Sequence, residues 1–108
     1  FRGSHELDYT FGYPPLINDK ELTELVEKEA ALVVTDDRLK EAAMSLASED
    51  MAFFLECVPG CIFKIGVRNN SKGFSQPLHN SRFDMDEEGL NIGVEVLVRS
   101  ALTYLSAS

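Results

Sequence analysis

The sequence predicts an α/β fold, and three observations indicate it. Strand-like and helix-like patterns follow one another along the chain, in the order strand, helix, uncertain element, helix, strand, loop, helix. The chain has 108 residues, about the length of one domain. Its 44% hydrophobic and 26% charged residues are typical of a folded globular protein. We therefore expect one compact α/β unit, or part of one.

The first third of the chain predicts a strand and then a helix. β-branched and aromatic residues between positions 6 and 13 favour a strand, which Pro14 and Pro15 end. Asn18 is the expected N-cap of the helix, with Glu21 three residues later as in a capping box. One face of this helix then carries Leu22, Leu25, Val26, Ala30 and Val33.

The middle of the chain contains one ambiguous stretch and one short helix. Residues 35–46 fit a helix locally, and a partly buried strand at 38–43 is the alternative. Ser48 is the expected cap of a short helix with Glu49 and Asp50 in its first turn, where the helix dipole favours acidic side chains. A Pro-Gly pair ends this helix, whose apolar face comprises Met51, Phe54, Leu55 and Val58.

The last part of the chain predicts a strand, a loop and a long helix. Residues 61–67 alternate as a strand does, with one face formed by Cys61, Phe63, Ile65 and Val67. Residues 68–77 are polar and rich in turn formers, which predicts a loop. A helix follows Asp84 and Asp86, and its expected apolar face comprises Leu90, Val94, Leu97, Val98, Ala101 and Leu105.

Charge and composition exclude several classes of function. A net charge of -8 opposes binding to phosphate backbones, so we expect no nucleic-acid partner. The chain has neither an apolar run of about 20 residues nor a signal-peptide pattern, which predicts a cytoplasmic protein without a membrane partner. Cys57 and Cys61 lack a second pair of ligands, so we interpret them as two packed thiols near a turn, not as a zinc or redox site.

A series of short motifs resembles successive landmarks of one metallopeptidase family. That family comprises aminoacylases, hippurate hydrolases, auxin-conjugate (IAA-amino acid) hydrolases and the carboxypeptidase G group, and the resemblance is closest to the hippurate and auxin-conjugate branch. It covers nearly the whole chain and matches the C-terminal end of the family's proteins. The motifs, in the family's order, are Gly12-Tyr13-Pro14-Pro15 with Asn18-Asp19, Ala47-Ser48-Glu49-Asp50-Met51-Ala52-Phe53-Phe54, Val58-Pro59-Gly60, Ile65-Gly66, Pro77-Leu78-His79 and Phe83-Asp84-Met85-Asp86-Glu87-Glu88-Gly89-Leu90.

The resemblance implies a two-domain enzyme whose mixed-sheet α/β catalytic domain is interrupted by a smaller inserted domain. Residues 6–13 would be the last strand of the inserted dimerisation domain, and residues 14–108 the C-terminal part of the catalytic domain. This makes residues 38–43 a strand in preference to a helix. Residues 1–5 resemble residues left by an expression vector or tag. We therefore exclude them from the fold prediction and do not count His5 as a ligand.

The resemblance also implies metal-dependent hydrolysis of the amide bond of N-acyl amino acids or related small amides and peptides. His79 matches the family's C-terminal metal-binding histidine, although Asn80 and Ser81 replace the Ser-Pro that usually follows. The parent enzyme would hold two divalent ions (zinc, manganese, cobalt or nickel) that activate water and polarise the carbonyl. The chain contains no catalytic residue of that reaction, since Glu87 and Glu88 only open the last helix. We therefore expect the chain alone to be inactive.

Two further questions stay open at the level of sequence. Glu49 and Asp50 match an acidic pair of the family, and they either stabilise a helix start or support the metal site and position the substrate. A different class of function is a non-catalytic acidic α/β interaction or self-association module, in which an exposed sheet edge drives assembly. We expect a homo-oligomer as the form in solution.

Overall fold

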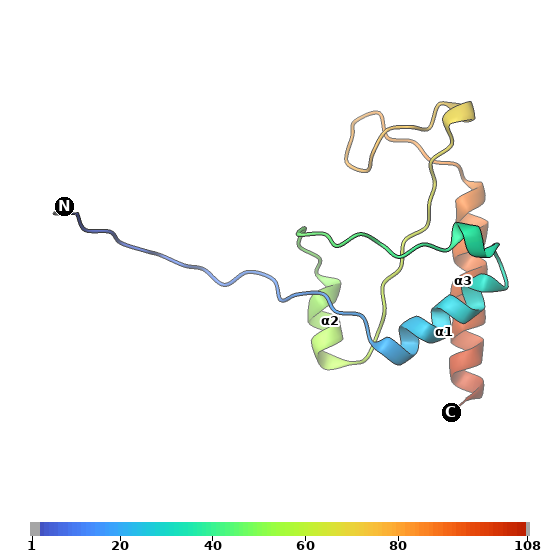
Figure 1. The fold of residues 1–108 in the computed structure, drawn as a ribbon, viewed down its shortest axis with the longest axis horizontal. Helices are drawn as coiled ribbons and strands as arrows, with labels where there is room; N and C mark the ends of the chain where they lie inside the picture. Colours follow the sequence, from blue (N-terminus) through green and yellow to red (C-terminus); the bar gives the residue numbers. More distant parts are fainter. Residues whose placement is uncertain (1–2, 108) are drawn as a thin grey trace.

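The computed structural model describes residues 3–107, which form three α-helices joined by extended segments and short 3-10 turns (Figure 1). Helices α1 and α3 pack against each other, and Thr103 Oγ1 donates a hydrogen bond of 2.8 Å to Glu29 Oε1 between them. The radius of gyration is 18.8 Å, whereas a compact domain of this length has about 13 Å. The elements in chain order are α1 (Lys20–Ala31), η1 (Asp36–Arg38), α2 (Met51–Cys57), η2 (Asn70–Lys72) and α3 (Glu88–Ser106).

The prediction of an α/β fold with a mixed sheet is wrong, because residues 3–107 contain helices and no strand. The strands expected at 6–13, 38–43 and 61–67 do not form, and the β-pairing in this part of the chain is one isolated bridge between Asn69 and Phe74. A strand needs a neighbour for its N–H and C=O groups, and a two-stranded pair is marginal even when the neighbour is present. The chain as described is helical.

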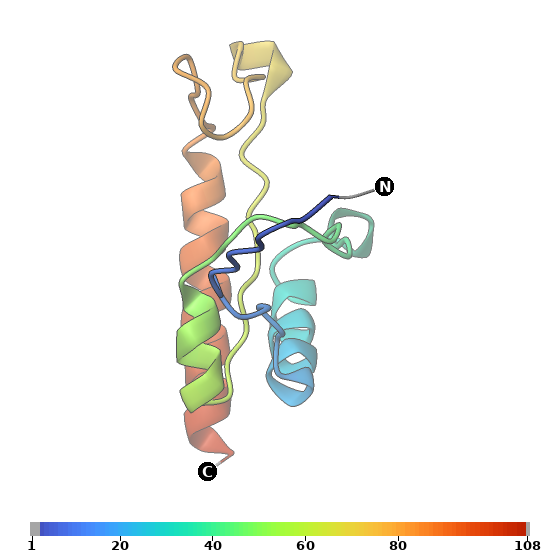
Figure 2. The same cartoon turned by 90° about the vertical axis from the view of Figure 1, so that its left-hand side faces the viewer.

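The segment 61–67 nevertheless keeps the side-chain alternation of a strand. Its half-buried residues are Cys61, Phe63, Ile65 and Val67, and the residues between them are exposed. The segment runs beside α3 (Figure 2), and a Cβ added to Gly89 would come within 3.0 Å of Val67 Cγ1. The alternation therefore shows which face of the segment a helix covers, although the segment is not part of a sheet.

Asn18 joins the segment 61–67 to the start of α1, and this explains a small error in the predicted cap. Its side-chain amide donates to Ile62 O at 2.9 Å and its Oδ1 accepts from Ile62 N at 3.0 Å, as a neighbouring strand would. The side chain of Asn18, the predicted N-cap, is thus hydrogen-bonded to Ile62 and does not cap α1. Asp19 caps α1 in its place, with Oδ1 accepting from Leu22 N at 2.9 Å.

Helix α2 is shorter at its start than the sequence predicts. It begins at Met51, with Asp50 at the N-cap position and no side-chain cap bond from that residue. Ser48 is therefore not the cap, and Glu49 and Asp50 precede the helix. Glu49 Oε1 accepts from Met51 N at 3.2 Å, which gives the helix start a weak substitute for a cap. The helix ends at Cys57, before the Pro-Gly pair, as predicted.

Helix α3 has the predicted extent, but its predicted apolar face is not the side that is buried within residues 3–107. The expected face is exposed, with Leu90, Val94, Leu97, Val98 and Leu105 between 51% and 69% accessible. The buried residues are Gly89, Val96 and Ser100 on the opposite side of the helix. The extended segment reaches this side closely because glycine carries no side chain there.

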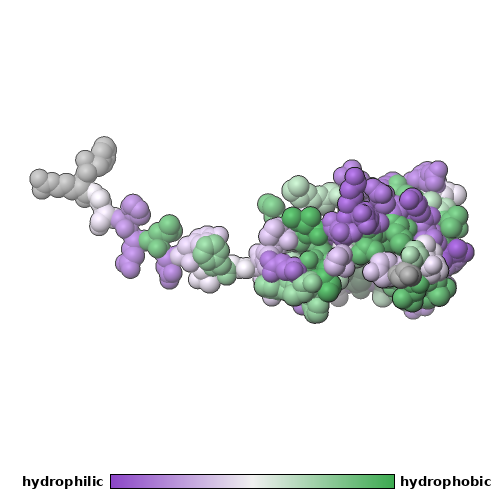
Figure 3. Space-filling view, turned by 90° about the horizontal axis from the view of Figure 1, so that it is seen from below, coloured by the Kyte–Doolittle hydropathy of each residue, from purple (hydrophilic) through white to green (hydrophobic). Residues whose placement is uncertain are grey.

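The surface and the N-terminal segment both carry exposed apolar residues. Figure 3 shows hydrophobic surface between hydrophilic patches on the face seen from below. The N-terminal residues extend away from the helices (Figure 1), and Tyr13 lies against Phe53 of α2 with ring centroids 5.2 Å apart. Of the five residues predicted as a tag, residues 1 and 2 lie outside the described residues. Within residues 3–107, no helix combines the length and apolarity needed to cross a membrane.

Candidate functional site

His79 lies in the loop between η2 and α3, at a tight β-turn. Asn80 N donates to Pro77 O at 3.1 Å, which closes a four-residue turn with His79 at its third position. His79 has a φ of 70°, the positive value that this position requires in a type II turn. Histidine adopts positive φ more readily than most residues with a side chain. The turn thus presents an exposed imidazole at the tip of a loop.

The base of this loop is closed by Asp86, just before α3. Asp86 N donates to Val67 O at 2.9 Å, so the two ends of the loop meet. Its carboxylate accepts from Lys72 Nζ at 2.8 Å and from Asn69 Nδ2 at 2.6 Å. The hydrogen bonds from Lys72 and Asn69 hold the pKa of Asp86 below its ordinary value, and the same contact raises the pKa of Lys72.

Asn69 organises the first arm of the loop. Its Oδ1 accepts from Ser71 N at 3.1 Å, Ser71 Oγ at 2.6 Å and Lys72 N at 3.3 Å. Its backbone exchanges two hydrogen bonds of 2.9 Å with Phe74, and Gly73 supplies the positive φ of 82° that closes the turn between them. Sequence patterns did not predict this arrangement, because Asn69 and Asp86 lie 17 residues apart. The signal available in the sequence was a polar loop that precedes the start of a helix.

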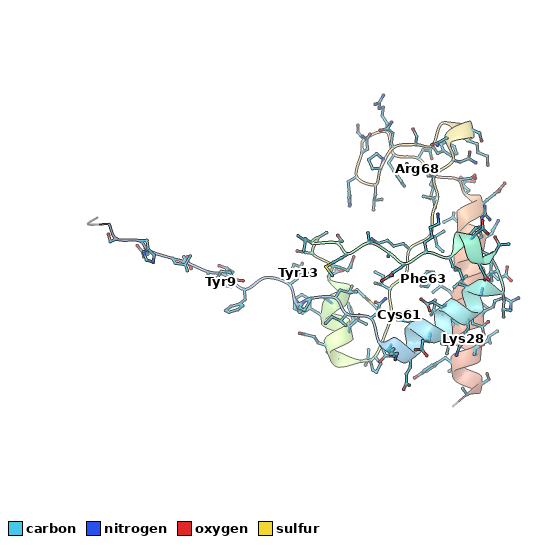
Figure 4. The ribbon with its side chains drawn as sticks, viewed as in Figure 1. Tyr9, Tyr13, Lys28, Cys61, Phe63 and Arg68 are labelled. Carbon is cyan, nitrogen blue, oxygen red and sulfur yellow. The ribbon has the colours of Figure 1, made fainter. Side chains whose placement is uncertain are left out.

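A groove of about 380 Å³ borders the turn that carries His79. Its apolar wall is formed by Ile65, Val67, Leu78 and Phe83, and Lys64, Arg68 and Asp84 also line it. Figure 4 shows Arg68 where the extended segment enters the loop. Leu78, which lines the groove, directly precedes His79 in the chain, and His79 itself is not one of the lining residues.

The described residues fit one ligand position of a metal site and do not complete such a site. Among residues 3–107, no three His, Cys, Asp or Glu side chains come together in an arrangement that could hold an ion. The chemistry of His79 suits the role, because imidazole is a common ligand of zinc-like ions and this one is exposed. A metal ion bound by His79 would need further ligands from outside residues 3–107.

Glu49 and Asp50 are not brought to His79 by this structure. They precede α2, which lies apart from the His79 loop in both views (Figures 1 and 2). Both side chains are exposed, and Glu49 makes the local hydrogen bond to Met51 N. This contact supports the interpretation that the pair stabilises the helix start. A role beside the substrate stays a prediction.

The two cysteines differ in their surroundings. Cys61 is half-buried, as predicted for a packed thiol, whereas Cys57 is exposed. Burial raises the pKa of the Cys61 thiol, and nearby Asp19 and Glu27 act in the same direction, while a hydrogen bond with Thr23 acts against them. Cys61 is thus held in its protonated form, which is a poor nucleophile and a poor metal ligand.

Comparison with known proteins identifies the family. The model of peptidase family M20/M25/M40 matches residues 4–103. A protein of Rhodococcus jostii named as a provisional glutamate–cysteine ligase is 41% identical over 94% of the chain, which spans 12% of that protein. A probable hydrolase of Synechocystis is 32% identical over 96% of the chain, and thermostable carboxypeptidase 1 of Saccharolobus solfataricus is 37% identical over 75%.

The chain spans only a small part of these relatives, 27% of the Synechocystis protein and 20% of the carboxypeptidase. No solved structure matches the chain significantly. The family match covers most of the sequence, includes His79, and agrees with relatives named as hydrolases. The chain belongs to peptidase family M20/M25/M40, the family of aminoacylase-like and amidohydrolase-like metallopeptidases.

Proposed function

We propose that this chain is the C-terminal part of a metal-dependent amidohydrolase that cleaves the amide bond of N-acyl amino acids or related small amides and peptides. The observation that carries the proposal is the family match over residues 4–103, because His79 lies inside it on an exposed turn. Members of the family are generally metal-dependent. Relatives named carboxypeptidase and IAA-amino acid hydrolase support amides of amino acids as the substrate class.

In this proposal the chain contributes one metal ligand and one wall of the substrate site. When bound, divalent ions such as zinc, manganese, cobalt or nickel would polarise the amide carbonyl and lower the pKa of water. His79 would hold one of two ions through its imidazole. The groove beside it would receive an apolar acyl group against Ile65, Val67 and Leu78, while Lys64 and Arg68 supply positive charge for a carboxylate.

Proton transfer and the remaining metal ligands belong, in this proposal, to other parts of the full-length protein. Residues 3–107 hold no group of three ligands, and their radius of gyration exceeds that of a compact domain. Both observations support a chain that works as part of a larger enzyme. The domain boundaries proposed from the sequence, residues 6–13 and 14–108, follow the same interpretation.

The experiment that tests this proposal compares the full-length protein with the isolated chain. Each is assayed on N-acetyl, hippuryl and indoleacetyl amino acids with added zinc, manganese or cobalt. We expect the full-length protein to release free amino acid and the chain alone to release none above the metal-only blank, because one ligand does not hold a hydrolytic ion. Amino-acid release is followed by mass spectrometry.

Removal of metal provides the control for this assay. A chelator should abolish hydrolysis by the full-length protein, and added metal should restore it. Hydrolysis that persists after chelation would contradict metal dependence. Turnover by the chain alone would contradict the assignment of the catalytic groups to other segments.

A second function, self-association, is favoured by the apolar face of α3. Leu90, Val94 and Leu97 are each more than half exposed, and an apolar stripe of this length is uncommon on the surface of a monomer. We expect the isolated chain to form dimers or larger species at micromolar concentration in light scattering. The double change Leu90→Glu and Val94→Glu should return it to a monomer, while Leu46→Glu, outside α3 and 99% exposed, should not. A monomeric wild-type chain would dismiss this function.

A further inference from the structure

The loop that carries His79 is closed at its base by Asp86, beside a longer ion pair of 3.8 Å between Lys72 and Glu88. Val67 O accepts from Asp86 N at 2.9 Å, so the chain leaves and returns at one point. Residues 68–85 lie between these two positions, and the His79 turn is in their second half. Closing a loop of this length has an entropic cost that only contacts at its ends and arms offset.

The carboxylate of Asp86 supplies those contacts. Oδ1 accepts from Lys72 Nζ at 2.8 Å and Oδ2 accepts from Asn69 Nδ2 at 2.6 Å, and both partners lie on the first arm of the loop. The Asp86 side chain is only 15% exposed, whereas that of Lys72 is 47% exposed. One side chain therefore joins the second arm of the loop to the first, with both of its oxygens in use.

A helix-start role alone does not explain these contacts. Glu88 N lies 3.5 Å from Asp86 Oδ1, which is long for a hydrogen bond, so the carboxylate caps α3 weakly. The contacts to Asn69 and Lys72 are shorter by 0.7 Å or more. The side chain thus serves mainly the loop, and Glu87 stands beside it without a side-chain cap bond.

We propose that Asp86 is a positioning residue that holds the His79 loop closed and so preorganises His79 to bind a divalent metal ion. Residues 68–85, which form this loop, contain little regular secondary structure. A ligand on such a loop binds weakly unless its support fixes it, because the cost of ordering is otherwise taken from the binding free energy. This inference rests on the proposed role of His79, whereas the closure of the loop does not.

The test uses the full-length protein with Asp86→Ala and the matched control Glu87→Gln. The control removes a carboxylate from the same helix start and leaves the hydrogen bonds of Asp86 to Asn69 and Lys72 in place. Two properties are measured: trypsin cleavage after the exposed Arg82 in metal-free protein, and zinc affinity by chelator competition. Asp86→Ala should speed cleavage, and it should weaken zinc binding by about 10-fold, the lower end of the effect of residues that support metal ligands. Glu87→Gln should change neither.

Further variants separate positioning from general loss of structure. Asp86→Glu retains a carboxylate and should recover part of both effects, and the melting temperature of Asp86→Ala should stay close to that of the wild type. Unchanged cleavage and zinc affinity in Asp86→Ala would overturn the inference, as would cleavage that spreads to all helices with a lower melting temperature. If Asp86→Ala speeds cleavage while His79→Ala leaves zinc affinity unchanged, the proposed function fails and the loop closure stands.

Discussion

In the proposed amidohydrolase, replacing His79 with alanine should reduce metal-dependent amide hydrolysis by about 100-fold or more. Residues that only support a metal ligand already change affinity or activity by about 10- to 100-fold, so loss of a ligand itself should do at least as much. The alanine side chain offers no donor, and among residues 3–107 no three His, Cys, Asp or Glu side chains come together to hold an ion in its place. Metal content by elemental analysis and kcat/KM on a hippuryl amino acid measure the effect.

The chain offers a matched control for this experiment. His5 is its second histidine and is likewise exposed, but it lies on the extended N-terminal segment. His5→Ala should leave metal content and kcat/KM unchanged. Equal losses in the two variants, or full activity in His79→Ala, would remove His79 from the metal site.

Replacing Gly89 with valine should lower the free energy of unfolding by about 1–3 kcal/mol, the usual cost of overpacking. A Cβ at this position would lie 3.0 Å from Val67 Cγ1, 3.4 Å from Ile65 Cγ2 and 3.5 Å from Gly66 O. The contact with Val67 Cγ1 is tighter than nearly all real Cβ contacts, so Val67 or the extended segment that carries it must shift away from α3. Denaturant unfolding of the full-length protein, followed by circular dichroism, measures the change.

Gly93→Ala is the matched variant on the same helix face. Its Cβ would come no closer than 3.4 Å to Ile65 Cγ1, an ordinary contact, and alanine favours a helix interior over glycine by about 1 kcal/mol. It should leave the free energy of unfolding unchanged or raise it. A Gly89→Val protein as stable as the wild type would show that the segment is not packed against α3.

Local patterns in the sequence predicted the helices well, whereas the sheet required information that these patterns do not contain. The period of Leu22 and Leu25 and the break at Pro59 are local, and the helices they predicted formed close to the expected positions. The alternation of residues 61–67 was also correct for side-chain burial. It does not identify a hydrogen-bond partner, and without one the segment stays extended and unpaired.

The inner face of α3 shows a second limit of the pattern. Hydrophobicity indicated the side of α3 that carries Leu90 and Val94. The extended segment packs instead against the side that carries Gly89 and Gly93, because the small glycines allow a close approach there. The candidate site shows a third limit. Nothing in periodicity marks His79, which was identified through family resemblance. Asp86 was predicted only as a residue before a helix, because its partners lie far away in the sequence.

The distribution of bulk on α3 also bears on how the chain can be engineered. Its inner side carries little mass, from Gly89 through Val96 to Ser100, while its heavy side chains face outward. Charged side chains can therefore replace residues on the outer side of α3, whereas larger side chains on its inner side would disrupt contacts within the chain. A version redesigned to stay soluble on its own would keep the glycines and take its new lysines and glutamates along the leucine side of the helix.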